Sequence, residues 1–514
     1  MPKRLAIVCL CLLCRVAAPA QDHAAAEAHH QQGMSLYRAR DVEGAIRELT
    51  RAVEIDPGDA PSWNDLGVIQ RQRGRLQIAI ECFRKAVAAN PQFSSALYNL
   101  ALALEASGDL GSAVGQVRRV IALAPRLPQG HALYGRLLMA QNQLEPARDE
   151  LERALELDPV LPGVRTNLGA VLYKLGHITE ALRELQQAVR QDPQSAQAEF
   201  QLGLALFSSG AQQEAKAAFE HAVKLDPQLM EARINLGQLQ ENENQMIEAI
   251  AQYRSVLQAA PGNSDAALHL ARALIKTQAL EQARSTLDST LRHQPRDATL
   301  HFERGKLLAS VGEQEAALRD LKMAIQLNPN AAGFYLELSR VLHEMGQTEQ
   351  QKAALKTAVR LDPNLVEARY ALANLARQQG DSAASHEQFE KVQKLREAEV
   401  NRDLALGDIR AGVVLAEKHE YDGAIEHFRN AIAIDPHLGE AHFNLAGALL
   451  EKGDVPAAIS GFREAIRLAP EWAEAHYQLG RALLRAGARD EAMAEFRTAL
   501  KCDPQHTAAR QALR

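Results

Sequence analysis

Residues 473–506 read AEAHYQLGRALLRAGARDEAMAEFRTALKCDPQH and contain every feature that the rest of the chain repeats. Gly480 and Ala492 are small enough for two helices to approach closely, and Phe496 is large enough to interlock between them. Gly487 suits the left-handed residue that ends a first helix. Pro504 ends a second helix, because the residue before a proline is pushed out of the helical region. The segment therefore predicts a helix, a tight turn and a helix.

The same segment recurs along almost the whole chain, and internal repeats of this length indicate a solenoid. Prolines keep an interval of 34 residues up to residue 363 and resume it from residue 436: Pro57, Pro91, Pro125, Pro159, Pro193, Pro227, Pro261, Pro295, Pro329, Pro363, Pro436, Pro470 and Pro504. With proline as position 32, fourteen repeats begin at residues 26, 60, 94, 128, 162, 196, 230, 264, 298, 332, 366, 405, 439 and 473.

Small residues hold two positions of each repeat. Position 8 is glycine, alanine or serine throughout, and position 20 is alanine in all repeats but two, which have Gln351 and Ser385. Position 15 is glycine in nine repeats, and asparagine in two as Asn142 and Asn244. We therefore predict an all-α fold of about fourteen helix-turn-helix repeats, stacked so that each repeat contacts its neighbours.

This pattern resembles the tetratricopeptide repeat, over residues 26–506. The resemblance implies a right-handed superhelix in which the first helices line a concave groove. Solenoids need polar covers at their ends. We expect residues 507–514 to be a truncated first helix that caps the array, and residues 21–25 to be a short lead-in.

The regular spacing fails once, in EKVQKLREAEVNRDLALGD at residues 390–408, where Glu397 stands at the place of proline and five extra residues precede the next repeat. Residues 387–406 contain neither glycine nor proline, so we expect the second helix of repeat eleven to continue. Five helical residues turn the chain by about 500° and lengthen it by about 7.5 Å. We infer an array of eleven repeats at 26–404, the last one extended, and an array of three at 405–506. The extension is either a projecting helix or hinge, or a bulge that leaves stacking unchanged.

Residues 1–20 read MPKRLAIVCLCLLCRVAAPA, with basic residues, an apolar run and a small-residue ending. This is the pattern of a secretory signal. The alternative of an uncleaved anchor is weaker, because the run is short of the ~20 residues that span a bilayer. We expect an exported protein, periplasmic or secreted. After the signal only Cys82 and Cys502 remain, and no later apolar run is long enough for a transmembrane helix.

The formal charge of the chain is −6, and the first twenty residues contribute three of the positive charges. An acidic protein of this kind does not favour nucleic-acid binding. Serine, histidine and aspartate are scattered singly, so no catalytic group is expected. Histidines recur at position 4 but lie a repeat apart, too far for one zinc site. We expect no metal or cofactor and assign these rings to half-buried positions where the family often has tryptophan.

The resemblance also places candidate binding residues in the groove. The family geometry points positions 2, 5, 9, 12 and 13 inward, and asparagines at position 6 hold a peptide backbone in O-linked N-acetylglucosamine transferases, which begin with a similar superhelix. Other residues interrupt that row here. Candidate partner-binding residues are Tyr98, Phe200 and Phe302 at position 5, Asn99, Asn167 and Asn235 at position 6, and Arg136, Gln238, Arg272, Lys306 and Arg340 at position 9.

Aromatic side chains beside basic ones suit a partner segment with apolar and acidic residues. The alternative is that the aromatic rings pack on the preceding repeat and that the basic groups pair with acids such as Glu231, Glu241 and Asp265. The sequence predicts a non-catalytic scaffold that binds proteins or peptides and specifies no oligomeric state. Two related hypotheses are an accessory subunit of an envelope machine that exports polysaccharide or pili, and a partner that recruits substrates for a separate glycosyltransferase.

Overall fold

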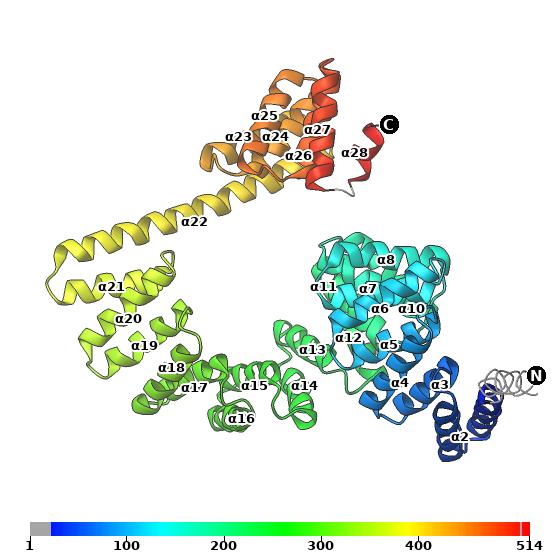
Figure 1. Cartoon of the computed structure of the whole chain (residues 1–514). Coiled ribbons are helices and arrows are strands. Elements are labelled where there is room, and N and C mark those ends of the chain that lie inside the picture. The colour runs from blue at the N-terminus through cyan, green and yellow to red at the C-terminus, as the bar shows by residue number, and fades with distance from the viewer. Residues whose placement is uncertain (1–21, 504–505, 514) are drawn as a thin grey trace, which may run out of the picture. The chain divides into compact units, whose positions relative to one another are not determined.

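The computed structural model describes residues 22–503 and 506–513, and this part of the chain contains helices but no strand. The predicted signal lies outside the described residues. Residues 22–38 are helical, so the helix begins within the expected lead-in. The chain divides into two compact units, one that ends at Pro295 and one that begins at Arg296. Within each unit, consecutive helices form hairpins that lie side by side (Figure 1).

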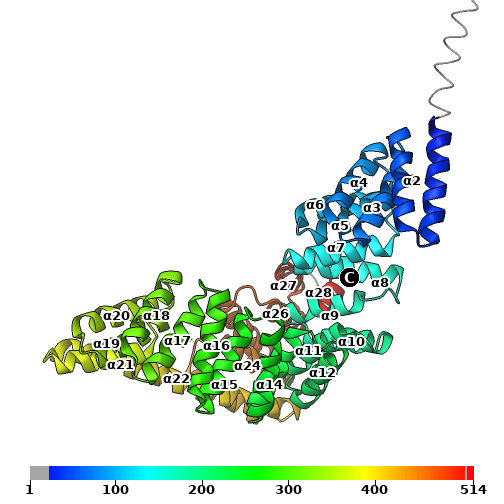
Figure 2. The same cartoon turned by 90° about the horizontal axis from the view of Figure 1, so that it is seen from below.

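In the first unit the helical residues 22–38 are followed by helices of 11 to 14 residues, joined by short turns (Figure 2). These helices are α2 (Val42–Ile55), α3 (Ala60–Gln72), α4 (Leu76–Ala89), α5 (Ser94–Ala106), α6 (Leu110–Leu123), α7 (Pro128–Ala140), α8 (Leu144–Leu157), α9 (Val164–Lys174), α10 (Ile178–Gln191), α11 (Ala196–Ser208), α12 (Gln212–Leu225), α13 (Met230–Asn242), α14 (Met246–Ala259), α15 (Ser264–Lys276) and α16 (Leu280–His293).

The second unit has the same hairpins and one much longer helix, α22. Its helices are α17 (Ala298–Ser310), α18 (Gln314–Leu327), α19 (Ala332–Glu344), α20 (Thr348–Leu361), α21 (Val366–Gln378), α22 (Ser382–Glu417), α23 (Tyr421–Ile434), α24 (Gly439–Lys452), α25 (Val455–Leu468), α26 (Ala473–Arg485), α27 (Arg489–Cys502) and α28 (Thr507–Ala512).

The turn inside each hairpin depends on a left-handed residue at position 15. All the glycines and asparagines predicted there have positive φ, from 58° at Asn142 to 95° at Gly453. Arg40, Gln278 and His419 take the same conformation in the three remaining repeats, although their side chains disfavour it. The geometry of the hairpin therefore overrides local preference at these three positions.

The two helices of a hairpin approach closely where position 8 faces position 24. A β-carbon added to Gly203 would lie 2.5 Å from the Phe219 ring, and one added to Gly480 would lie 2.5 Å from the Phe496 ring. Each fully buried ring stabilises its hairpin by about 1.5–3 kcal/mol. The predicted role of the small residues at position 8 is thus confirmed by contacts within the same repeat.

Neighbouring repeats are joined by a hydrogen bond that the sequence analysis did not foresee. The side chain at position 4 donates to the carbonyl of the proline that ends the preceding repeat, as in Trp63 to Pro57 at 3.1 Å. The same bond is formed by His131, Arg165, Arg233, Tyr335, Arg369, His442 and His476, over 2.6–3.3 Å. Proline thus ends one helix and presents an acceptor to the next repeat.

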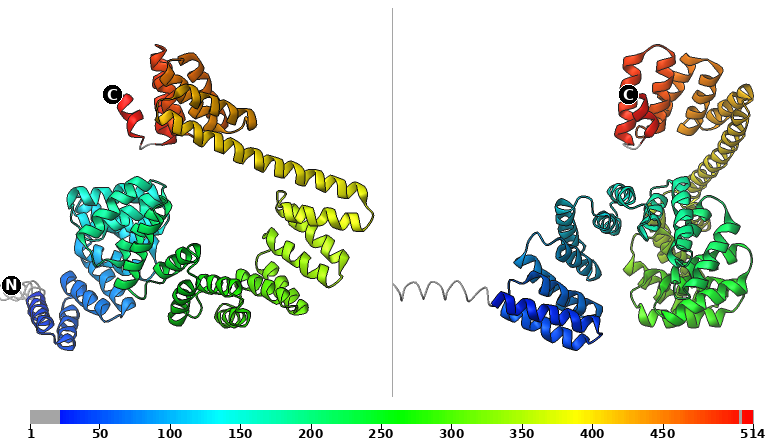
Figure 3. Two further views of the ribbon diagram at one scale, coloured as in Figure 1. Left: turned by 180° about the vertical axis from the view of Figure 1, so that it is seen from behind. Right: turned by 90° about the vertical axis from the view of Figure 1, so that its right-hand side faces the viewer.

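Helix α22 is continuous over 36 residues and includes the whole irregular segment at 390–408. It merges the second helix of repeat eleven with the first helix of repeat twelve, and in Figure 3 it is the long yellow helix. The five extra residues are therefore helical and do not loop out. An uninterrupted run of helix formers explains this, because nothing between residues 387 and 406 ends a helix.

The last helix, α28, lies against the final repeat. Ala509 is fully buried, and Ala512 and Leu513 pack against the cluster that contains Phe496. His506 Nε2 lies 3.0 Å from Glu474 Oε2, which ties the start of α28 to α26. These contacts cover the apolar end of the second unit.

Candidate partner-binding surface

The first helices of successive repeats present a row of side chains in each unit, which we call the first-helix surface. The structure places Tyr98 and Asn99 on α5, Arg136 on α7, Asn167 on α9, Phe200 on α11, Asn235 and Gln238 on α13, Arg272 on α15, Phe302 and Lys306 on α17, and Arg340 on α19. The first eight belong to the first unit and the last three to the second.

One cluster joins predicted residues of two neighbouring helices. The Arg136 guanidinium donates from Nε to Glu105 Oε1 at 2.8 Å and from Nη2 to Glu105 Oε2 at 2.6 Å. This carboxylate raises the pKa of Arg136, and burial raises the pKa of the Tyr98 hydroxyl. Asn99 donates to Asn64 at 2.9 Å. A bidentate pair of this kind fixes the direction of the guanidinium.

The cluster leaves room for a partner. The Arg136 side chain is 43% exposed although both oxygens of Glu105 hold it, and Tyr98 is half-buried. We call Tyr98, Asn99, Glu105 and Arg136 the α5–α7 patch. It presents an aromatic ring, a guanidinium edge and an amide, all on first helices.

Other polar groups of the first-helix surface bond across neighbouring repeats. His30 Nε2 lies 2.9 Å from Asp65 Oδ2, and Lys276 Nζ lies 3.1 Å from Glu241 Oε2. Gln238 lies 2.8 Å from His269 Nε2. Burial lowers the pKa of His269, so the neutral ring accepts from the Gln238 amide. These bonds orient the surface before any partner arrives.

The asparagines at position 6 do not share one role. Asn99 bonds to Asn64, whereas Asn235 donates to the Glu231 carbonyl of its own helix at 2.8 Å. Asn167 is half-buried, and no hydrogen bond of its side chain is found in the described chain. The three amides therefore differ in their freedom to hold a peptide backbone.

Two of the aromatic residues at position 5, Phe200 and Tyr477, lie against the second helix of their own repeat. The Phe200 ring is 5.9 Å from the Phe219 ring, and the Tyr477 ring is 5.7 Å from the Phe496 ring. Phe200 is only 7% exposed, so it belongs to the core and offers a partner little area. We therefore leave it out of the proposed binding surface.

In the second unit the predicted basic residues pair with acids one turn earlier. Lys306 lies 3.5 Å from Glu303 and 5.4 Å from the centre of the Phe302 ring, which stacks on Phe334 at 4.5 Å. Arg340 donates to Glu337 at 2.8 Å. The basic groups are partly exposed, at 43% for Lys306 and 59% for Arg340, whereas Glu303 and Glu337 are largely covered, so the basic ends are the parts of these pairs that a partner can reach.

Glu303 and Glu337 differ from the acids expected from the sequence for these pairs, and the aromatic residues at position 12, Tyr37, Tyr173 and Phe207, were not predicted as part of the surface. Tyr173 on α9 accepts from Ser208 at 3.2 Å, and Phe207 on α11 is exposed. The spacing of three residues would have revealed the pairs of Lys306 and Arg340. Glu105 precedes Arg136 by 31 residues, so finding that pair requires the stacking of two repeats.

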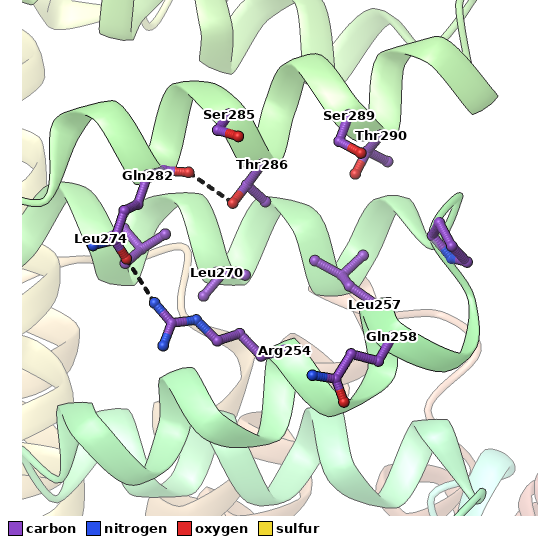
Figure 4. A pocket seen from close by; sticks show the side chains of 11 residues that line it. Arg254, Leu257, Gln258, Leu270, Leu274, Gln282, Ser285, Thr286, Ser289 and Thr290 are labelled. Atoms are coloured by element: carbon purple, nitrogen blue, oxygen red, sulfur yellow. Dashed lines mark hydrogen bonds between the residues drawn. The ribbon is translucent and has the colours of Figure 1, made fainter.

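Apart from the first-helix surface, a depression of about 390 Å³ lies among α14, α15 and α16 (Figure 4). Its lining includes the hydroxyls of Ser285, Thr286 and Ser289, and Arg254 donates to Gln282 at 2.6 Å. None of its lining residues is histidine, cysteine, aspartate or glutamate. The pocket thus lacks a side chain suited to act as a general base near neutral pH.

The histidines at position 4 already have partners. His131 Nδ1 lies 2.6 Å from Glu150, and His476 Nδ1 lies 2.6 Å from Glu495. Both rings are buried and bond to the preceding proline carbonyl through Nε2. Across residues 22–503 and 506–513, no three metal-ligating side chains gather into a possible site. No helix in this range has the length and hydropathy of a membrane span.

Comparison with known proteins adds the following. Models described as tetratricopeptide repeats match residues 30–93, 64–128, 166–229, 213–264, 243–301, 332–365, 415–462 and 449–514, and a model described as TPR repeat matches 135–176. No curated protein matches the chain.

Two solved structures are similar in fold. The first is the Cut9–Hcn1 hetero-tetramer of the APC/C, with 16% identity and a TM-score of 0.40 over 95% of each chain. The second is a tetratricopeptide repeat protein of Parabacteroides merdae, with 17% identity and a TM-score of 0.38 over 49% of this chain and 98% of that one. With its fourteen hairpins and these matching models, the chain belongs to the tetratricopeptide repeat family, whose arrays serve as scaffolds for protein–protein interactions.

Proposed function

We propose that this protein is a non-catalytic scaffold that binds a segment of another protein on its first-helix surface. The observation that carries the proposal is the α5–α7 patch. There the Arg136 guanidinium is held in one orientation by Glu105 and remains partly exposed beside Tyr98. A group that is oriented in advance loses less freedom on binding.

The chemistry of the patch defines the class of partner. A guanidinium edge beside an aromatic ring suits an acidic side chain next to an apolar one, and arginine and tyrosine are frequent anchors of interfaces. The Asn99 amide can add a bond to the partner's backbone. We infer that the partner presents an exposed segment with both kinds of residue.

We also propose that the protein acts in an exported compartment. Only the pattern of residues 1–20 supports this part, and those residues lie outside the described chain. Amino-terminal sequencing of the protein recovered from the exported fraction should read from Gln21. An amino terminus upstream of Ala20, or recovery only from the cell interior, would contradict it.

The binding surface is tested by removing Arg136. Substitution Arg136→Ala should reduce recovery of a partner in a cross-linked pull-down at least fivefold, because the oriented guanidinium is lost. Arg153→Ala is the matched control. Arg153 lies on the second helix α8, is similarly exposed and pairs with Glu156 at 2.6 Å.

Tyr98→Ala should lower recovery as Arg136→Ala does, since both belong to one patch. Circular dichroism of each variant should match the native protein. Equal recovery with the native protein, Arg136→Ala and Tyr98→Ala would place binding elsewhere and refute the proposal for this surface.

A further inference from the structure

At helix α22 the interface between repeats eleven and twelve, here called the joint, is open, meaning that its apolar side chains are uncovered. The exposure of the side chain at position 10 of the first helix reveals this. This residue is at most 4% exposed in repeats two to eleven, thirteen and fourteen, as Ile69, Ala103, Leu137, Val171, Ala205, Leu239, Ala273, Leu307, Val341, Leu375, Ala448 and Ala482. The first repeat, which follows none in the described chain, has exposed Ser35 there. In repeat twelve Val414 is 49% exposed, so no preceding repeat covers it.

The uncovered face of repeat twelve is a stripe along α22. Leu404 and Val414 are exposed, and Gly407 and Ala411, between them, are half-buried. Their spacing of three and four residues puts them on one side of the helix. Val400 extends the same side and is also exposed.

The end of repeat eleven is open as well. Its position-5 ring, Tyr370, is 47% exposed. In repeats thirteen and fourteen the position-5 rings are covered by rings from position 34, Phe443 by Trp472 at 4.5 Å and Tyr477 by His506 at 4.9 Å. Tyr370 instead borders an apolar pocket of about 460 Å³, with Phe389, Val392 and Val400 in its wall.

The proline and the position-4 donor that join neighbouring repeats elsewhere are both absent at this joint, whereas the apolar faces remain. Glu397 stands in place of proline, and position 4 is Asp408, which accepts from His427 at 2.8 Å and cannot donate to a carbonyl. The two open faces would cover each other in a regular array. Within one chain they lie on the two halves of a single helix about 54 Å long, so they cannot meet.

We propose that a second copy of this chain closes both faces, with the two α22 helices antiparallel across a two-fold axis. Each copy then supplies its repeat twelve to the open repeat eleven of the other. Exchange of equivalent elements between identical chains is a common route to closed dimers. The surfaces that meet are the ones that the intact joints of this chain already pair.

The register of the intact joints places the axis. Position 18 of a second helix contacts position 14 of the next first helix, as in Glu43 with Arg73 at 2.6 Å and Gln213 with Glu243 at 2.9 Å. The same register sets Ala383 of one copy opposite Lys418 of the other. The axis then crosses α22 at its midpoint, beside Val400.

Charge supports this arrangement. With the two-fold axis beside Val400, the antiparallel pairing places Arg396 of one α22 helix on the same side of the helix pair as Asp403 of the other. Both residues are exposed, and neither is in an ion pair found in the described chain; the Arg396 guanidinium lies 5.9 Å from the centre of the Tyr370 ring, beside the open face. The symmetry produces the contact twice, once on each side of the axis.

One residue makes this joint weaker than its counterparts. Position 28 is valine, isoleucine or leucine in every repeat except the eleventh, where it is Gln393. A polar residue in the joint lowers its apolar area, so the dimer should dissociate on dilution. Gln393→Ile should strengthen it at least threefold.

Sedimentation velocity of the full chain over a range of concentrations tests the proposal. The native protein should pass from one chain to two as concentration rises. Val414→Glu should weaken the association at least tenfold, because a charge replaces the joint residue at an already exposed site. Ile247→Glu, which alters an 82% exposed apolar residue of α14, should leave it unchanged.

Swapping the charges of Arg396 and Asp403 distinguishes this dimer from a dimer that forms through another surface. Arg396→Asp and Asp403→Arg should each weaken association about tenfold, and the double variant should restore it. Cysteine introduced at Val400 should form a covalent dimer on oxidation, whereas cysteine at Ile247 should not. A native protein that stays a single chain at roughly 100 µM, and so has a dimer Kd well above that concentration, would overturn the proposal. So would a dimer that is indifferent to Val414→Glu and to both charge variants.

Discussion

At the scale of single residues, the most informative positions are those where the fold overrides the side chain. Gln278 is held at φ 62° and Arg40 at φ 66°, in the conformation that glycine occupies in most other repeats. A left-handed residue other than glycine costs about 1 kcal/mol. The array therefore contains local strain that a single substitution can remove.

Gln278→Gly should stabilise the α15–α16 hairpin by about 0.5–1 kcal/mol, since the relief of strain exceeds the entropy that glycine loses. Native-state hydrogen exchange of α15 and α16 measures this. The reverse change, Gly210→Gln, should destabilise α11 and α12 by a similar amount, because it places a side chain at a positive φ. Nothing lies within 4 Å of a β-carbon there, so a steric clash adds nothing to that backbone strain. Faster exchange in Gln278→Gly would contradict the assignment of strain.

His30 makes the first joint dependent on pH. Its hydrogen bond to Asp65 raises its pKa above the ordinary value, with Asp59 and Glu27 adding to the effect. A raised pKa in the folded state means that the bond stabilises fully below the ordinary pKa of histidine. That contribution is lost as pH rises through the raised value.

We therefore expect His30→Gln to speed hydrogen exchange of residues 22–38 at pH 5.5 and to change it little at pH 8.5. Each variant is compared with the native protein at the same pH, so the intrinsic exchange rate cancels. A difference that grows with pH would have the wrong sign and would refute the role given to this pair.

At the scale of helices, the close approach of the two helices in a hairpin makes small residues indispensable. A β-carbon at Gly203 meets the Phe219 ring at 2.5 Å, and the ring cannot move because it is almost fully buried. Overpacking of this kind costs about 1–3 kcal/mol. Repeat thirteen shows the natural compensation, where Ala446 at position 8 faces Gly461 on α25.

Gly203→Ala should accordingly destabilise α11 and α12 by about 1–3 kcal/mol, measured by hydrogen exchange. Gly115→Ala is the matched control, since Gly115 is a solvent-exposed residue in the middle of α6 and no atom lies within 4 Å of a β-carbon placed there. That change should stabilise α6 by about 0.5–1 kcal/mol. Equal effects of the two substitutions would mean that the contact with Phe219 is not tight.

At the scale of the whole molecule, the period of the sequence predicts the fold because the same few contacts recur in each repeat. The contact of position 8 with position 24 follows from residue type, and so does the left-handed position 15 where it is glycine or asparagine. At Arg40, Gln278 and His419 only the repeat period indicates it. The continuity of α22 follows from the absence of any residue that ends a helix. These features are local, so one sequence is enough to predict them.

The candidate surface was less accessible to sequence analysis. Asn99, Arg136 and Gln238 lie on first helices as predicted, but their polar atoms bond to Asn64, Glu105 and His269. Those partners belong to neighbouring repeats, and only the stacking decides which side chains meet. The bonds from position 4 to the preceding proline carbonyl escaped prediction for the same reason.

The open joint at α22 ties the folding of the last repeats to the amount of protein present. The apolar face of repeat twelve around Val414 is not covered by repeat eleven of its own chain, and three repeats are close to the smallest array that is stable. A second chain that fills the joint adds stability by mass action, in proportion to the logarithm of its concentration. The carboxy-terminal repeats would then be most resistant to proteolysis where the protein is abundant and would unfold first where it is scarce.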